Sequence, residues 1–137
     1  MSTLFRIHSD LRWLLVMVAI LTLARLALGL FGQRPYDKSS RILMLVFGIL
    51  VDVQVVVGLI YFVWNGARHD FWPRYRFEHM AVMLIALFVA HLPVRWRKAP
   101  GAIRTRNELL TVIVVLALIF VGVLVLVGGM NRWEPNF

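Results

Sequence analysis

Four long apolar stretches alternate with short polar connections along the chain. Each stretch approaches or exceeds the roughly 20 residues that a helix needs to cross about 30 Å of hydrocarbon. The connections contain Pro35, Pro73 and Pro100, a residue type that favours turns. The pattern therefore predicts four membrane-spanning helices, at about residues 8–31, 42–64, 77–97 and 105–130.

The connections are short enough to determine the expected topology. Helices joined by short connections lie next to each other and run antiparallel. We therefore expect an all-α fold, an integral membrane up-down-up-down four-helix bundle that forms a single domain over residues 1–137. The first stretch is long for a cleavable signal peptide and contains Arg25, so it is expected to remain as the first helix.

The composition agrees with a membrane environment. Hydrophobic residues make up 61% of the chain, against about 45 to 50% in soluble domains. Charged residues make up 16%, which is too few to cover the surface of a soluble monomer, so a lipid bilayer is the expected surrounding. The chain has no cysteine, which excludes disulfides, thiolate metal sites and covalent c-type haem attachment.

The net charge of +8 comes mainly from basic residues in the connections, not from a basic face with interleaved aromatic residues. This distribution argues against nucleic acid as a partner and is typical of contacts with anionic lipid head groups. The first and third connections carry more Lys and Arg than the side that holds both termini. The positive-inside rule therefore predicts both termini on the outer, periplasmic side.

Two histidines lie at the same expected depth on different helices. His8 is at the start of the first helix and His79 at the start of the third, and each continues a stripe of small and apolar residues. Small residues mark the surfaces where membrane helices approach closely, so both imidazoles are expected to point into the bundle. The stripe of His8 contains Arg12, Leu15, Ala19, Thr22 and Leu26. The stripe of His79 contains Met83, Ala86 and Ala90.

Two inward imidazoles at one depth are the axial ligands that a bis-histidine haem b requires. His8 and His79 are therefore candidate ligands of a haem iron, with Arg6, Arg12 or Arg76 as a candidate partner of the haem propionates. The alternative is that each histidine is only an interfacial polar residue near the head groups.

Three further ionisable residues fall inside the predicted spans: Arg25, Asp52 and His91. His91 follows His79 by twelve residues, about 18 Å along a helix axis, so the two cannot share a site. One interpretation is a buried hydrogen-bonded pair of Asp52 and His91 near the midplane. Alternatively, Arg25 lies close enough in depth to form a salt bridge with Asp52. A third interpretation is that Asp52 and His91 form a proton or quinone site, because a carboxylate and an imidazole exchange protons with a reducible carbonyl.

Gln54 lies about 200° from Asp52 around the second helix, and each has a glycine one turn away. Because one small bundle can hardly bury both faces, Gln54 is expected either to hydrogen-bond a neighbouring helix or to face a second protein subunit.

The apolar part of the fourth stretch, from Leu109 to Met130, offers only Thr111 as a polar side chain and is expected to be scaffold. The chain has no paired-carboxylate centre, no HExxH motif and no phosphate-binding loop. No catalytic residue is assigned, and no independent catalytic activity is expected.

Three segments of this sequence resemble small bacterial four-helix membrane proteins that are often labelled cytochrome b-like. They run from His8 to Trp13, from Gln54 to Tyr61 and from Phe77 to His91. The resemblance implies a haem-binding or quinone-associated bundle in the bacterial inner membrane, with His8 and His79 as ligand candidates and His91 as a third. The second and fourth predicted spans lack histidine, so a second haem is not implied.

The leading hypothesis from the sequence is a membrane-embedded carrier of one b-type haem, linked to quinol or to respiratory or photosynthetic electron transfer. The alternative is a cofactor-free accessory subunit that packs against other membrane protein subunits of a larger electron-transfer complex. A third hypothesis is an antenna-like protein in which single histidines ligate pigments.

Overall fold

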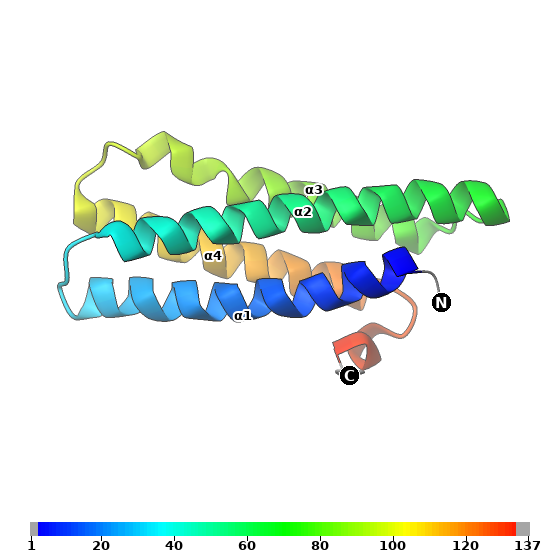
Figure 1. Cartoon of the computed structure of the whole chain (residues 1–137), viewed down its shortest axis with the longest axis horizontal. Coiled ribbons are helices and arrows are strands. Elements are labelled where there is room, and N and C mark those ends of the chain that lie inside the picture. The colour runs from blue at the N-terminus through cyan, green and yellow to red at the C-terminus, as the bar shows by residue number, and fades with distance from the viewer. Residues whose placement is uncertain (1–2, 134–137) are drawn as a thin grey trace.

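The computed structural model describes residues 3–133, and the elements in that range are all helical. Four α-helices run alternately up and down, and both ends of the described chain lie toward the same end of the bundle (Figure 1). Two short 3-10 helices follow α3 and α4. The elements are α1 (Thr3–Phe31), α2 (Lys38–His69), α3 (Arg74–Ala90), η1 (Leu92–Trp96), α4 (Gly101–Leu124) and η2 (Gly129–Trp133). The predicted all-α four-helix bundle is confirmed.

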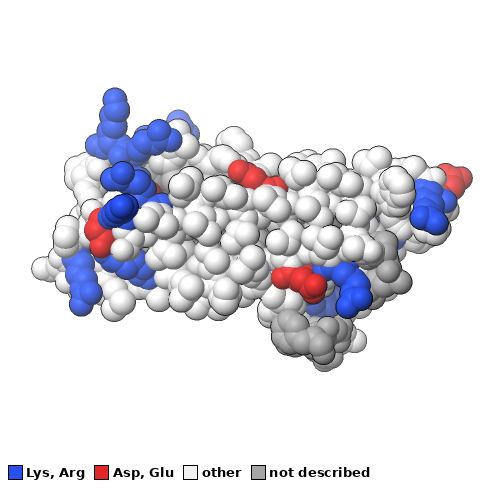
Figure 2. Space-filling model, in the orientation of Figure 1, with Lys and Arg blue, Asp and Glu red and all other residues white. Residues whose placement is uncertain are grey.

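Four helical segments are long and apolar enough to cross a membrane: α1, α2, α3 together with η1, and α4. Lys and Arg gather at the two ends of the molecule, and the middle of the visible surface is almost free of charge (Figure 2). An uncharged band between charged ends is the pattern of a protein that spans a bilayer. The chain is therefore a multi-pass membrane protein.

The first two helices extend further than the sequence predicted. α1 begins at Thr3 instead of residue 8, and α2 covers Lys38–His69 instead of 42–64. No proline interrupts these extensions, and α2 stops at Asp70, whose backbone is left-handed (φ 46°) and whose N–H bonds back to Gly66. Apolar runs indicate where a helix crosses the lipid, but its polar turns continue beyond that boundary.

The third predicted span, at about 77–97, corresponds to Arg74–Trp96, but only its first part is α-helical. α3 starts at Arg74, directly after Pro73, and its α-helical part ends at Ala90. Pro93 explains the end, because its nitrogen donates no hydrogen bond and its ring disfavours a helical residue before it. The chain continues as the 3-10 helix η1 to Trp96.

The fourth predicted helix, 105–130, begins and ends too late. α4 starts at Gly101 after Pro100 and ends at Leu124. Gly128 and Gly129 have positive φ angles of 95° and 39°, a conformation that glycine adopts without strain. The chain turns there, and η2 folds back until Trp133 lies against Trp13 of α1, with 6.0 Å between ring centroids.

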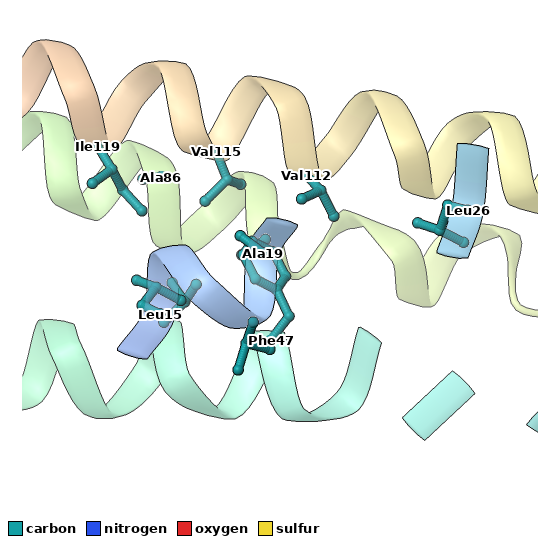
Figure 3. Close-up of a cluster of buried hydrophobic side chains, with 11 residues drawn as sticks. Leu15, Ala19, Leu26, Phe47, Ala86, Val112, Val115 and Ile119 are labelled. Atoms are coloured by element: carbon teal, nitrogen blue, oxygen red, sulfur yellow. The ribbon is translucent and has the colours of Figure 1, made fainter. Parts of the chain in front are cut away.

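All four helices contribute to one apolar core (Figure 3). Ala19 and Ala86 are almost fully buried, and their small side chains let α1 and α3 approach the bundle axis. The predicted stripes on these helices are thereby confirmed as interior faces. The core residues labelled in Figure 3 are Leu15, Ala19 and Leu26 of α1, Phe47 of α2, Ala86 of α3, and Val112, Val115 and Ile119 of α4.

Asp37 connects the first two helices at the end of the bundle opposite the termini. Its Oδ1 accepts hydrogen bonds from the Ser40 backbone N–H (2.9 Å) and hydroxyl (3.1 Å), and its Oδ2 lies 2.7 Å from Nη2 of Arg25. The Ser40 N–H and the Arg25 guanidinium lower the pKa of Asp37 to about 2 from its usual 3.8. The carboxylate thus caps α2 and fixes the end of α1 against it.

The lowered pKa of Asp37 predicts a pH-dependent loss of stability. The stabilisation is complete above the unfolded-state pKa of 3.8 and disappears as the pH falls through about 2. Asn also caps helices, so Asp37→Asn removes the charge and keeps the cap. Thermal unfolding in detergent should show a lower Tm for the variant near pH 6, with the difference closing toward pH 2. An equal difference at both pH values would contradict this role.

Candidate functional site

His8 of α1 and His79 of α3 meet inside the bundle. Their ring centroids are 6.4 Å apart, and the ring planes are nearly perpendicular at 86°. α1 and α3 are diagonal neighbours, because each packs mainly against α2 and α4. Two side chains from diagonal helices therefore meet near the bundle axis, at the shared depth that the sequence predicted.

His79 is held in one orientation by α4. Its Nδ1 lies 2.6 Å from the carbonyl oxygen of Gly122. A carbonyl only accepts, so Nδ1 carries the proton, and the neutral ring presents the lone pair of Nε2. A Cβ on Gly122 would overlap the terminal methyl of Met83, so that flexible side chain would have to move. This arrangement resembles the carbonyl-backed imidazoles that ligate metals in proteins.

His8 is held by α2. The side-chain Nε2 of Gln54 donates to the backbone carbonyl of His8 at 2.9 Å and lies 3.5 Å from Nε2 of the His8 ring. A Cβ on Gly58 would come within 2.8 Å of Cε1 of His8, so glycine provides the space for the imidazole. Nδ1 of His8 is buried and has no hydrogen-bond partner among residues 3–133.

The predicted role of Gln54 at an interface with another subunit is wrong. Its side chain is 8% exposed and points inward to His8. The other alternative, a hydrogen bond to a neighbouring helix, is confirmed. Asp52, on the opposite face of α2, is the residue that faces outward.

The two histidines line a divided hollow near the end of the bundle that holds the termini. One part has a volume of about 130 Å³ and the other about 310 Å³. Small-molecule sites usually enclose about 300 to 1,000 Å³. The residues that line both parts are three apolar and four polar: Phe5, Met83 and Leu126, and His8, Gln54, His79 and Arg132.

Three arginines border this hollow, and Asp10 is the acidic side chain on its described wall. Arg12 donates to the carbonyl of Arg132 at 2.5 Å and stacks on Trp133, with its guanidinium carbon 5.1 Å from the ring centroid. Nη1 of Arg76 is buried without a hydrogen-bond partner among the described residues. The excess of positive charge suits a ligand that carries carboxylates.

Asp52 and His91 form the pair that one interpretation of the sequence expected, but the pair is not buried. Nε2 of His91 lies 3.3 Å from Oδ1 of Asp52, and their side chains are 53% and 45% exposed. Nδ1 of His91 lies 2.8 Å from the carbonyl of Leu87. The prediction of burial fails because α2 and α3 turn these side chains toward the outside of the bundle.

The expected alternative pairing of Arg25 with Asp52 is also wrong. Arg25 instead forms the 2.7 Å salt bridge with Asp37 in the connection to α2. A long side chain near a helix end extends toward the polar boundary, where its charge is stabilised.

Glu108 is a buried polar residue that the sequence analysis missed. Its side chain is 1% exposed, and Oε1 accepts a 3.0 Å hydrogen bond from Nε of Arg104. The guanidinium of Arg104 also lies 4.1 Å from the ring centre of Tyr36. Burial and the nearby Glu108 raise the pKa of the Tyr36 hydroxyl above its usual value. The spacing Arg104-x-x-x-Glu108, one helical turn, was the available signal.

The described residues contain no group of three or more His, Cys, Asp or Glu side chains that could hold a metal ion. His8 and His79 instead offer two nitrogen donors, which suit a metal whose remaining ligands belong to a larger bound group. The sequence matches no family model, and comparisons with curated proteins and with solved structures also give no match.

Proposed function

We propose that the protein binds one b-type haem between His8 and His79 and acts as an electron carrier in the membrane. The observation that carries this proposal is the pair of inward imidazoles with centroids 6.4 Å apart. Two imidazoles that share one metal ion through bonds of about 2 Å have ring centres about 6 Å apart. Perpendicular ring planes are compatible with this, because each ring can rotate about its bond to the metal.

The surroundings of the imidazoles support the same proposal. The Gly122 carbonyl fixes the proton of His79 on Nδ1 and directs the Nε2 lone pair to a ligand. His8 has a buried ring nitrogen, Nδ1, without a partner among the described residues. Met80 and Met83 line the hollow, and their unbranched side chains repack readily around a flat group.

The arginines at the rim of the hollow provide charges that suit the haem propionates. Arg12, Arg76 and Arg132 place positive charge beside an apolar hollow, which is what a macrocycle with two propionates requires. A haem held here supplies one-electron transfer through its iron. The chain supplies the ligands, excludes water with the apolar wall, and balances the propionate charge.

The proposed orientation of the protein in the membrane follows from its charge distribution. The connections at the α1–α2 and α3–α4 end carry the excess of Lys and Arg, so we place that end in the cytoplasm and the haem site near the outer face of a bacterial inner membrane. A quinol or a membrane dehydrogenase is the proposed electron donor. Partner membrane subunits belong to the same proposal.

The alternative function is a cofactor-free accessory subunit, and Gln54 does not support it. That hypothesis took Gln54 as a contact to another subunit, and the side chain is directed at His8. The inward imidazoles, the hollow and the unpartnered arginine nitrogen favour a bound group instead.

Haemin titration tests the proposal. The protein, expressed without haem and purified in mild detergent, should bind haemin to saturation at one per chain, with a low-spin absorption spectrum. His91→Ala, which lies outside the site, should give the same end point. Binding that does not saturate, or a spectrum equal to that of haemin in empty detergent, would rule out a defined site.

Gly58→Ala should weaken haem binding about tenfold, as changes beside a metal ligand typically do. The added Cβ comes within 2.8 Å of His8 and displaces its ring. Gly48→Ala is the matched control, because a Cβ at that position of the same helix meets nothing within 4 Å. Haemin titration of the two variants measures the difference, and equal affinities would mean that the position of His8 does not matter.

A further inference from the structure

One wall of the hollow belongs to a short segment and not to a membrane-spanning helix. After α4 ends at Leu124, the chain turns, and η2 lies beside α1, outside the four helices (Figure 1). Residues 128–133, the strap, contribute to the lining of the larger part of the hollow through Gly128, Asn131 and Arg132. The position of the strap therefore decides how open this part of the hollow is.

The side chain of Trp133 holds the strap in place. Its ring lies 6.0 Å from the ring of Trp13 of α1 and 5.4 Å from that of Phe120 of α4. The guanidinium carbon of Arg12 lies 5.1 Å from the same ring, and Arg12 donates to the carbonyl of Arg132. No ion pair among the described residues joins the strap to a helix. Aromatic and cation–π contacts are individually weak, so the strap can open while the four helices stay packed.

The backbone provides a hinge at the start of the strap. Gly128 and Gly129 are consecutive, with φ angles of 95° and 39°. Glycine has no Cβ, so both torsions of each residue rotate with little steric hindrance, and a hinge needs only a few such positions. Across this turn Arg132 donates to the carbonyl of Val127, a contact that opening must also break. Rotation at the two glycines moves η2 with Trp133 and leaves α4 in the core.

Positive charge couples the strap to the ligand. Arg12 and Arg132 both border the hollow, and two guanidinium groups close together repel each other. Nε of Arg12 is buried and has no hydrogen-bond partner among the described residues. A carboxylate bound between the two arginines reduces the repulsion and supplies an acceptor, so it favours the closed strap.

We propose that residues 128–133 are a lid that opens at Gly128 and Gly129, admits the ligand from the water at the end of the bundle that holds the termini, and closes over its carboxylates. Trp133 is the latch, and it does not itself line the hollow. The identity of the ligand as haem rests on the proposed function, whereas opening of the lid is a property of the protein without ligand. The competing route is entry from the lipid, between the helices.

Thiol labelling of the protein without haem tests the lid, because the chain has no cysteine. Met83→Cys places a thiol on the wall of the hollow, and Met130→Cys places one on the strap, where Met130 is 59% exposed. An anionic methanethiosulfonate, which does not enter lipid or detergent tails, is added to each variant in mild detergent. The thiol in the hollow should react roughly tenfold more slowly than the thiol on the strap, because it waits for the lid to open.

Trp133→Ala in the Met83→Cys background should speed this labelling about tenfold, the scale of one aromatic and one cation–π contact. Trp133→Phe keeps an aromatic ring and should restore most of the slow rate. Trp64→Ala is the matched control, because it removes an indole that is 57% exposed on α2. Circular dichroism checks that the helices are retained. A labelling rate that Trp133→Ala leaves unchanged would overturn the lid and favour entry between the helices.

Haemin kinetics test the coupling to the ligand. In the Trp133→Ala variant of the natural chain, haemin binding and haemin release to excess apomyoglobin should both become about tenfold faster, with little change in Kd, because a lid limits both directions. Faster release alone would make Trp133 a part of the binding wall and overturn the lid. Faster thiol labelling in a protein that binds no haemin would support the lid and contradict the proposed function.

Discussion

Replacing either His8 or His79 with alanine should abolish the low-spin haem spectrum of the protein. With one imidazole removed, the iron loses an axial ligand and no longer has the strong field of two nitrogen donors. The two substitutions should act alike, because the rings face each other from α1 and α3. Absorption spectra of the purified reduced and oxidised variants measure the effect.

His91→Ala is the control for these variants, because His91 pairs with Asp52 on the outer face. It should keep the complete spectrum. Circular dichroism and size-exclusion chromatography establish that each variant retains its helices and remains dispersed. A full low-spin spectrum in the His8→Ala or the His79→Ala protein would remove that residue from the ligand set.

Arg104→Ala should destabilise the bundle by about 3 kcal/mol, the scale expected when one partner of a buried ion pair is removed. The Glu108 side chain is 1% exposed, and Arg104 donates to its Oε1 at 3.0 Å. Oε2 of Glu108 already has no hydrogen-bond partner among the described residues. Loss of Arg104 therefore leaves a buried carboxylate without compensation. Unfolding in mixed micelles with increasing sodium dodecyl sulfate measures the loss.

Two comparisons separate the ion pair from a general effect of charge. Arg106→Ala removes an exposed arginine of the same helix and should change stability by less than about 0.5 kcal/mol. The double variant Arg104→Leu with Glu108→Leu should recover most of the loss, because apolar replacement of both members of a buried pair is often neutral. A single Arg104→Ala variant as stable as the Arg106→Ala protein would show that the pair contributes nothing.

The number of helices and the position of the histidines followed from the sequence for a physical reason. Long apolar runs have no stable alternative to helix in a bilayer, and helical periodicity placed Leu15, Ala19 and Ala86 on interior faces. The same periodicity and short connections placed His8 and His79 at one depth. Helix ends were less predictable, because they depend on local backbone features such as those at Pro93, Gly128 and Gly129.

The orientation of α2 could not be obtained from its sequence. Asp52 and Gln54 lie on opposite faces, and each has a glycine one turn away, so the pattern was symmetric. The packing of α2 against α1 turned Gln54 to His8 and left Asp52 outside. Glu108 was overlooked for a related reason. It directly precedes the apolar run, at the polar end of the predicted helix 105–130, where a carboxylate is expected to be exposed.

The most direct test of the proposed haem site is a reduced-minus-oxidised absorption spectrum, with pigment extraction, of the protein purified in mild detergent from its native membrane. We expect a sharp b-type band and close to one haem per chain. Protein without haem that co-purifies with larger membrane subunits would contradict the haem site and favour the accessory subunit.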